Sequence, residues 1–215
     1  MAVTLPNGSL VAIASGYGSA KTITAITNAN PGVATSAAHG FTDGDILEVT
    51  SGWSRLTNKI VRVDGSAAGT FELEGIDTTS TSVYSAGGGT GTAREITGWT
   101  QLAQIVGSTS SGGEQQFLNY QFLEADAESR IPTFKSAAGI QFTVADDPSL
   151  PGYILAKAAN DDRVPRAIRV TLSNGAILLY NAYVSLSTIP SLTVNELMTI
   201  EVTLSLTAEP VRYAS

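Results

Sequence analysis

The sequence predicts a mainly β protein with one α-helix, and three observations support this fold class. Residues 198–207 alternate strictly between apolar and polar side chains, a period of two that is typical of a strand with one buried face. Residues 20–95 contain short Thr- and Val-rich runs separated by turn sequences about every ten residues. Asn174-Gly175 separates two apolar runs, which indicates a hairpin because both turn residues tolerate positive φ.

The first half of the chain is expected to start with a strand and continue into a small β domain. The strand is predicted at residues 7–15. Turn sequences such as Asn30-Pro31-Gly32 then divide residues 20–95 into short strands, which is typical of an antiparallel β domain. Small residues at 16–20 and the glycine-rich segment 87–91 flank this domain like paired hinges. This arrangement indicates a module inserted into an exposed loop of another domain.

Beyond residue 95 the sequence predicts longer strands and the helix. Strands are expected at residues 114–123, 139–145, 167–172, 176–186 and 197–207. An acidic loop is expected at 124–132. The helix is predicted at 150–160, because Asp146-Asp147-Pro148 before it suits the N-terminal end of a helix dipole and its first turn.

These elements predict two domains. The main domain is expected to comprise residues 1–19 and 96–215, and the inserted domain residues 20–95. A chain of 215 residues is long enough to bury a core in each.

The composition limits the classes of partner. Only 14% of the residues are charged, which suggests that neighbouring molecules cover much of the surface. The net charge of −7 argues against tight binding of nucleic acid through its phosphates, whereas passive repulsion of DNA would need this sign. There is no Cys, so disulfides and thiolate metal sites are excluded. No apolar segment approaches the length of a membrane span or export signal, so no membrane partner is expected.

Candidate residues for chemistry are scarce. His39 is the only histidine, and it lies in a turn sequence, where a structural role is expected. The pairs Asp43/Asp45, Asp146/Asp147 and Asp161/Asp162 match no calcium-binding spacing and suit turns or helix ends. Gly87–Gly91 lacks the glycine spacing and following helix of a dinucleotide-binding loop. The sequence therefore predicts no catalytic, cofactor-binding or metal-binding residue, no small-molecule substrate and no enzymatic activity.

Several consecutive elements in the main domain carry a family resemblance. They are Trp99-x-x-Leu102-x-x-Ile105, Phe142-Thr143-Val144-Ala145-Asp146-Asp147-Pro148, the helix, Arg166-Ala167-Ile168-Arg169-Val170, Asn174-Gly175, Ala182-Tyr183-Val184-Ser185 and the terminal strand. In this order they resemble the major tail tube protein of long-tailed, non-contractile bacteriophages. The resemblance covers about residues 1–19 and 96–215, and it rests on element order more than on a diagnostic motif.

The resemblance implies a fold, an assembly and partners. The fold would be a tail-tube β-sandwich or split barrel with one flanking helix. Six copies would form a ring, and rings would stack into the tube that conducts DNA into the host. The implied partners are the tape measure protein and DNA in the lumen, and the tail tip and terminator proteins at the tube ends. The protein would be assembled in the host cytoplasm and located in the virion tail. The inserted domain, which resembles small β modules of phage structural proteins, is expected on the outer surface.

Two sets of residues are expected to act in this assembly. The polar face of the last strand is predicted to line the lumen through Thr199, Glu201, Thr203 and Ser205. Neutral hydroxyl groups can be hydrated without attracting phosphate, and repeated carboxylates repel it. Alternatively, this face covers the outside or meets the next ring, and the lumen is lined by the face that carries Arg169, Thr171 and Ser173. The acidic loop is predicted to contact the next ring through Glu124, Asp126, Glu128 and Arg130.

A different function remains open at the level of sequence. The protein could be another phage tail or fibre-associated β module that binds a host-surface saccharide. Trp53 near Arg55 and Asn58 is the cluster that would suit such binding, although a Trp is more often part of a core or interface.

Overall fold

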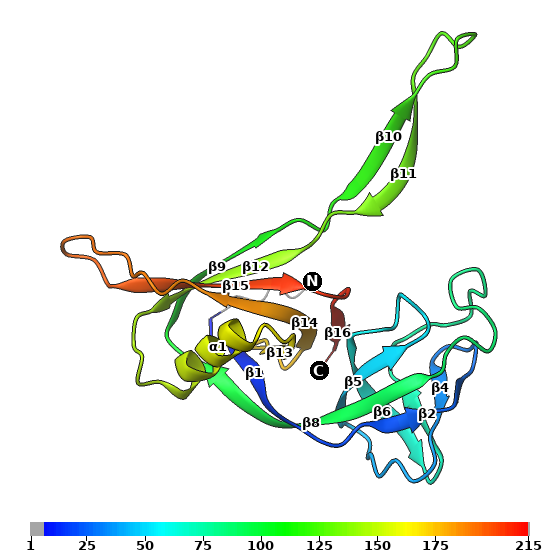
Figure 1. The fold of residues 1–215 in the computed structure, drawn as a ribbon, viewed down its shortest axis with the longest axis horizontal. Helices are drawn as coiled ribbons and strands as arrows, with labels where there is room; N and C mark the ends of the chain where they lie inside the picture. Colours follow the sequence, from blue (N-terminus) through cyan, green and yellow to red (C-terminus); the bar gives the residue numbers. More distant parts are fainter. Residues whose placement is uncertain (1–6, 215) are drawn as a thin grey trace.

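The computed structural model describes residues 7–214 and confirms the mainly β fold class (Figure 1). Residues 1–6 of the predicted main domain, and residue 215, lie outside the described residues. The first eight strands are β1 (Leu10–Tyr17), β2 (Lys21–Ile23), β3 (Ala25–Ile26), β4 (Gly32–Thr35), β5 (Ile46–Ser51), β6 (Lys59–Ala67), β7 (Thr70–Leu73) and β8 (Gly91–Leu102). They are followed by β9 (Ile105–Ser111), β10 (Gln115–Tyr120), β11 (Ser129–Lys135), β12 (Gly139–Ala145), α1 (Pro151–Asp162), β13 (Arg166–Thr171), β14 (Ile177–Leu186), β15 (Thr199–Leu206) and β16 (Val211–Tyr213).

One large antiparallel sheet connects both predicted domains. Its strand order is β3-β4-β7-β6-β5-β8-β1-β13-β14-β15-β12-β9, with β2 pairing with β8 and β16 with β14. β8 is the shared strand: residues 91–95 pair with β5, and residues 96–102 pair with β1. The chain therefore passes along one continuous strand from the 20–95 segment into the other part of the sheet. We call this part, which consists of β1, β13, β14, β15, β12, β9 and the short β16, the main sheet.

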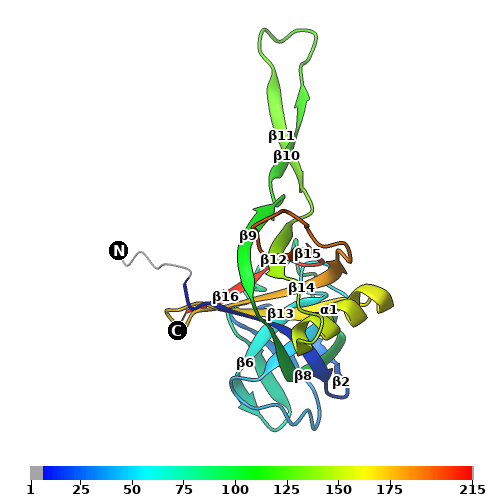
Figure 2. The ribbon, with the colours of Figure 1, turned by 90° about the vertical axis from the view of Figure 1, so that its left-hand side faces the viewer.

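Two separate hydrophobic clusters form the core. The first is built mainly from residues of the 20–95 segment, with Phe71, Leu47 and Leu73 fully buried, and it also includes Leu179 and Tyr213 of the main sheet. The second lies between the main sheet and α1, and its buried members are Val11, Ile13, Leu102, Phe142, Val144, Ala156, Ala159, Ile168, Ala182, Val184, Leu186, Ile200, Val202 and Leu204. Figure 2 shows α1 against this part of the sheet and the 20–95 segment below it.

The predicted alternation of the last strand and the predicted hairpin are confirmed. In β15 the apolar side chains Ile200, Val202 and Leu204 are buried, and the polar ones between them face the other side. The Asn174-Gly175 turn joins β13 to β14, and Gly175 has a φ of 84°, which glycine adopts without strain.

The helix begins slightly later than predicted. Pro151 takes an early position that requires no backbone donor, and Leu150 is the N-cap residue without a side-chain hydrogen bond. Asp147 does not cap the helix, because its Oδ1 accepts hydrogen bonds from the backbone N and Oγ of Ser149. The acidic residues before the helix therefore form a separate turn. Arg163 ends the helix in the left-handed conformation.

The acidic loop predicted at 124–132 is partly wrong, because residues 129–135 form β11. β11 pairs with β10 in a two-stranded ribbon, and residues 121–128 connect them. We call residues 114–136 the arm and residues 121–128 its tip. Figures 1 and 2 show the arm projecting from the rest of the molecule, at the end opposite the 20–95 segment. Pro132 is tolerated in β11 because a ribbon of two strands has a free edge on each side.

The glycine-rich segment 87–91 is not the open hinge that the sequence suggested. A Cβ atom on Gly89 would lie 2.8 Å from the Trp53 ring, and one on Gly91 would lie 2.0 Å from the Thr50 carbonyl oxygen. The glycines therefore allow close packing of this segment against β5 and the residues that follow it.

Buried polar contacts join the inserted segment to the main sheet. Glu48 on β5 is only 8% exposed, and its carboxylate accepts hydrogen bonds from Arg94 Nε at 2.6 Å and from Asn181 Nδ2 at 3.2 Å. The Tyr213 hydroxyl donates to the Glu74 carbonyl at 3.1 Å and accepts from the Arg62 backbone at 2.8 Å. Burial raises the pKa of Tyr213 to about 12.

Replacing Glu48 should destabilise the protein because its partners would lose their buried acceptor. For Glu48→Ala we expect a loss of about 2–3 kcal/mol in the free energy of unfolding, measured by denaturant titration. Glu72→Ala is the matched control, since Glu72 is a half-buried strand carboxylate that makes no ion pair with any described residue. Equal losses in the two variants would show that the Glu48 contacts contribute nothing.

Candidate assembly surfaces

A polar face extends across four neighbouring strands, β9, β12, β15 and the end of β14. Paired residues of an antiparallel ladder point to the same side of the sheet. On one side of β15, the register sets Thr143 and Gln141 of β12 beside Glu201 and Thr203. On the other side of β15, Ser185 of β14 lies beside Thr203. Gly107 and Thr109 of β9 continue these two rows. The face carries hydroxyl, amide and carboxylate groups and no cation from these positions.

The predicted lumen residues all lie on this polar face. Glu201 and Ser205 are exposed, and Thr199 and Thr203 are half-buried between neighbouring strands. The sheet side opposite them packs against α1 through the second core cluster. The structure thus brings the four residues together on one solvent-facing surface.

Two of the alternative lumen residues, Arg169 and Thr171, lie on the same side of the sheet as Glu201 and not on its opposite face, whereas Ser173 follows the end of β13. Arg169 pairs with Leu179 on β14, whose side chain points to the same side as Tyr183 and Ser205. The Arg169 guanidinium lies 4.6 Å from the centre of the Trp99 ring. Burial lowers the pKa of Arg169. Leu179 is buried against the 20–95 segment, Arg169 and Thr171 are half-buried, and Ser173 is exposed.

Two strand edges beside the polar face have no partner among residues 7–214. β9 is the last strand in the sheet order, so its outer edge is free. The ladder between β13 and β14 ends at the pair Arg166–Ala182, which leaves Tyr183–Ser185 without a strand on that side. At Leu186 the backbone N instead donates to Asn160 Oδ1 of α1 at 3.2 Å. Exposed strand edges of this kind favour pairing with another chain.

The arm exposes large apolar side chains to an unusual degree. Phe117, Leu118, Ile131 and Phe134 are each about half or more exposed on the ribbon. At the tip, Phe122 is 62% exposed and Leu123 is fully exposed. Since a soluble monomer rarely exposes a contiguous patch of this kind, the arm has the character of an interface.

The predicted inter-ring residues lie at or near the tip of the arm. Glu124, Asp126 and Glu128 are exposed in the connection, and Arg130 is exposed on β11 opposite Asn119. None of the four forms an ion pair with a described residue. The tip therefore combines exposed apolar groups with three carboxylates, and the guanidinium of Arg130 lies beside it on β11.

A second exposed apolar segment connects β14 to β15, and it projects from the side of the molecule away from the arm, at the left in Figure 1. Residues 187–198 expose the apolar side chains Ile189, Leu192, Val194, Leu197 and Met198. This exposed segment was not predicted from the sequence, although its apolar residues lie between two strongly patterned strands and lack the alternation of those strands.

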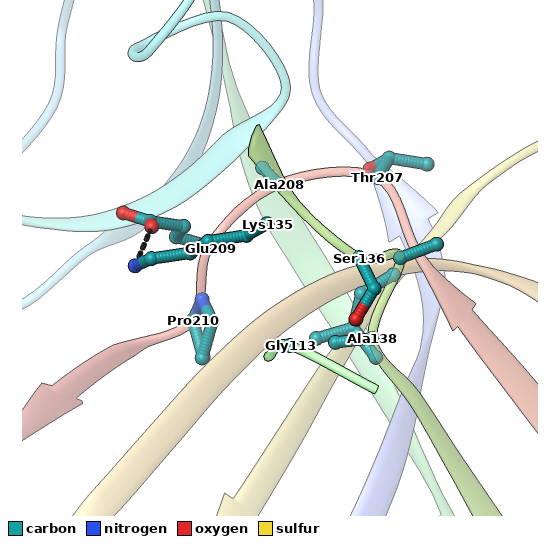
Figure 3. Close-up of a pocket in the computed structure, with 10 residues that line it drawn as sticks. Gly113, Lys135, Ser136, Ala138, Thr207, Ala208, Glu209 and Pro210 are labelled. Atoms are coloured by element: carbon teal, nitrogen blue, oxygen red, sulfur yellow. Dashed lines mark hydrogen bonds and ion pairs between the residues drawn. The ribbon is translucent and has the colours of Figure 1, made fainter. Parts of the chain in front are cut away.

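A cleft lies at the root of the arm, between the arm, the β15–β16 turn and the 20–95 segment. Its main cavity measures about 570 Å³ and is lined by Gly113, Lys135, Ser136, Ala137, Ala138, Leu206, Thr207, Ala208, Glu209 and Pro210. A neighbouring hollow of about 370 Å³ reaches Ser54 and Arg55 of the 20–95 segment. We call both together the root cleft. Figure 3 shows Lys135 and Glu209 at its rim, where Lys135 Nζ lies 2.6 Å from Glu209 Oε1.

Glycine shapes the root of the arm. Gly112 and Gly113 have φ values of 74° and 78°, and a Cβ on Gly112 would lie 1.9 Å from the Ala137 carbonyl oxygen. Hydrogen bonds from Gly113 N to Ser136 O and from Ser136 N to Glu114 O continue across the bend. β9 and β12 therefore extend into the arm as one bent hairpin.

His39 and Trp53, which the sequence offered as candidates for catalysis or saccharide binding, are buried and hydrogen-bonded within the fold. His39 is 3% exposed; its Nδ1 accepts a hydrogen bond from the Phe41 backbone, so Nε2 carries the proton and donates to the Ala67 carbonyl at 2.7 Å. Trp53 is 2% exposed and donates to the Ser85 carbonyl, so its ring has no face available to a saccharide. In the described part of the chain, no group of three potential metal ligands gathers. The described residues also include no helix long and apolar enough to cross a membrane.

Comparison with known proteins gives a family match. A sequence profile described as "Phage tail tube protein, TTP" matches residues 51–215, which is more than half of the chain. The match begins within the 20–95 segment and includes the arm, the polar face and the root cleft. No curated protein sequence matches the chain.

Three solved structures show weak similarity. A chain of the virion of a native gene transfer agent particle has 12% sequence identity and a TM-score of 0.43, covering 54% of this chain and 89% of that one. A chain from the sheath/tube terminator of an extracellular contractile injection system in its extended state has 16% identity and a TM-score of 0.38, covering 49% and 84%. A chain from the anti-feeding prophage cap has 18% identity and a TM-score of 0.36, covering 50% and 79%.

Proposed function

The chain belongs to the phage tail tube protein family, and from this premise we propose that it polymerises as stacked hexameric rings to form the tube through which DNA enters the host. As a member of this family, it is a structural component of the virion tail and not an enzyme. The observation that best supports the proposed mode of assembly is the pair of free strand edges on either side of the polar face.

Ring closure is proposed to occur by strand addition. The free edge of β9 in one copy would pair with residues 183–185 of β14 in the next copy. This contact is heterologous, since the two edges differ, and rotation closes it into a ring. Closure would also remove both exposed edges, which otherwise favour aggregation.

The dimensions of such a ring suit a channel. Each copy would contribute four strands, β9, β12, β15 and the end of β14, to a common barrel. Six copies with strands about 4.8 Å apart give a backbone circumference of at least about 115 Å and a diameter of at least about 37 Å, and the tilt of barrel strands widens both. This barrel is larger than those of porins, which already enclose aqueous channels with roughly 16–18 strands.

The polar face is proposed to line this channel. Thr199, Thr203 and Ser205 would keep the wall hydrated, and Glu201 would repeat a negative charge around each ring. DNA phosphates would be repelled and would not be held by counterion release, so DNA could slide. The proposed partners in the lumen are accordingly the tape measure protein before DNA ejection and DNA during it.

The arm is proposed to connect successive rings of a long, non-contractile tail. Its exposed apolar tip and the carboxylates Glu124, Asp126 and Glu128 would be covered by the next ring. Tail tip and terminator proteins would cover the surfaces left free at the two tube ends, with assembly in the host cytoplasm. The inserted domain is proposed to lie outside the channel wall. Supporting this position, its strands join the sheet through β8, far in the strand order from β9, β12 and β15.

Assembly of the purified protein tests this function. Sedimentation at rising concentration should show growth from monomers to rings and tubes, and negative-stain images should show stacked rings. A species that stays strictly monomeric at tens of micromolar, even with tail-tip components added, would contradict the proposed function.

A further inference from the structure

The root cleft concentrates positive charge in an acidic protein. Arg55 and Lys59 of the inserted domain lie near Lys135 of the arm and near Glu209. Burial, followed by the charges of Arg55 and Lys135, lowers the pKa of Lys59 against the opposing effect of Glu209. Three cations and one carboxylate leave two positive charges at this location, whereas the whole chain has a net charge of −7.

These positive charges are only partly compensated within one copy. Lys135 forms an ion pair with Glu209, but neither Arg55 nor Lys59 forms one with a described residue. Below them the cavity presents apolar surface from Ala137, Ala138 and Pro210. The cleft therefore suits a ligand that carries carboxylates beside apolar side chains.

The tip of the arm has the complementary chemistry. Glu124, Asp126 and Glu128 against Arg130 leave two negative charges, which match the two positive charges of the cleft. Phe122 and Leu123 next to them are exposed, and the Phe122 ring packs edge-on against Tyr120 of the arm at 5.2 Å. The cavity of about 570 Å³ lies within the range of roughly 300–1,000 Å³ that holds compact ligands in proteins.

We propose that the root cleft of one copy receives the acidic, apolar arm tip of another copy in the next ring. This inference rests on the proposed function, because it needs copies of the chain to be stacked. The tip cannot reach the root of its own arm, since the six residues of β10 separate them by about 20 Å. The contact is heterologous and does not close, so it extends the tube by one ring at a time. It also gives the inserted domain a role in stacking through Arg55 and Lys59.

Disulfide trapping tests the contact directly, because the natural chain contains no Cys. Ser54→Cys at the cleft and Ala127→Cys at the tip are combined in one chain, and both positions are exposed. A disulfide requires Cα atoms within about 7 Å, so the pair can form only between copies. After mild oxidation of assembled tubes, we expect a ladder of covalent species that extends beyond six copies on a denaturing gel.

Control variants separate this contact from others. Each single-Cys chain can give nothing larger than a covalent dimer. Ser54→Cys combined with Val194→Cys tests the exposed 187–198 segment as the occupant of the cleft instead, and we expect no ladder from it. The contact joins opposite charges, and dissolved salt screens the attraction between exposed charges over about 10 Å at 0.1 M. The rate of ladder formation should therefore fall as the salt concentration rises from 50 mM to 500 mM.

Three results would overturn the inference. The first is tubes whose tip and cleft cysteines yield dimers only, which would leave the tube function intact. The second is a ladder from the Val194 pair in place of the tip pair. The third is a ladder whose rate does not respond to salt, which would refute recognition by charge. Failure of the unmodified protein to assemble at all would instead contradict the proposed function itself.

Discussion

Shortening the arm is expected to abolish tubes while leaving each copy folded. In this variant an Asn-Gly turn replaces residues 115–135 between Glu114 and Ser136. Burying Phe122 or Leu123 in a contact between rings would stabilise that contact by about 1.5–3 kcal/mol per side chain. Losing both side chains would therefore lower the affinity between rings by about 10²–10⁴-fold. The fold should persist because the arm contributes no residue to either buried core cluster. Sedimentation and electron microscopy should show monomers or single rings.

A variant of full arm length provides the control for this prediction. Gln116→Ser with Asn119→Ser changes two exposed polar residues of β10 but keeps the tip and the strand pairing. This control should form tubes like the natural protein, and thermal unfolding should show that both variants are folded. Long tubes assembled from the shortened chain would show that stacking depends on other surfaces.

Glu201→Lys is expected to slow or stall the passage of DNA without preventing tube formation. The substitution would convert a ring of carboxylates into a ring of cations that bind phosphate. For about six phosphate contacts, DNA affinity changes by about 10³-fold between 50 mM and 200 mM salt, so the defect should be strongest at low salt. The measurement is the rate of DNA release from particles that carry the variant, at several salt concentrations.

Asp161→Lys is the matched control for charge reversal. Asp161 is exposed at the end of α1, on the side of the sheet opposite Glu201, and its replacement makes the same change in net charge. DNA release from this control should follow the natural protein. If Glu201→Lys instead leaves DNA release unchanged and impairs stacking, the polar face does not line the channel and meets another ring or the exterior.

The main sheet was predictable from sequence because its residues carry a clear burial pattern. Ile200, Val202 and Leu204 alternate with polar residues, and only a strand with one covered face satisfies that order. The Asn174-Gly175 turn was equally clear, since few residue pairs accept its backbone angles. These local signals are strong because each depends on residues adjacent in sequence.

The arm was only partly predictable because it has no buried face. Both sides of the β10–β11 ribbon are exposed, so Phe117 and Leu118 can stand next to each other without an alternating pattern. Acidic residues near Glu128 and Pro132 favoured a loop, although a free-edged ribbon tolerates both. If the arm is covered in the assembly, its sequence reflects contacts with other copies that one chain does not contain.

The charges of the root cleft were not predictable from sequence either. Arg55 and Lys59 are separated from Lys135 and Glu209 by more than seventy residues, and only the packing of the inserted domain beside the arm brings them together. The glycines of residues 87–91 wrongly suggested a hinge, because their contact with Trp53 also depends on residues far apart in the sequence. Their sequence suggests freedom of the backbone, whereas in the fold they allow close contact with a ring.

Electron cryomicroscopy of assembled tubes would show whether β9 and β14 of neighbouring copies close a ring around the polar face. We expect six copies in each ring, β9 of one copy hydrogen-bonded to residues 183–185 of the next, and Glu201 facing the channel. Rings joined through other strands, or a channel lined by α1 or by the inserted domain, would contradict this expectation.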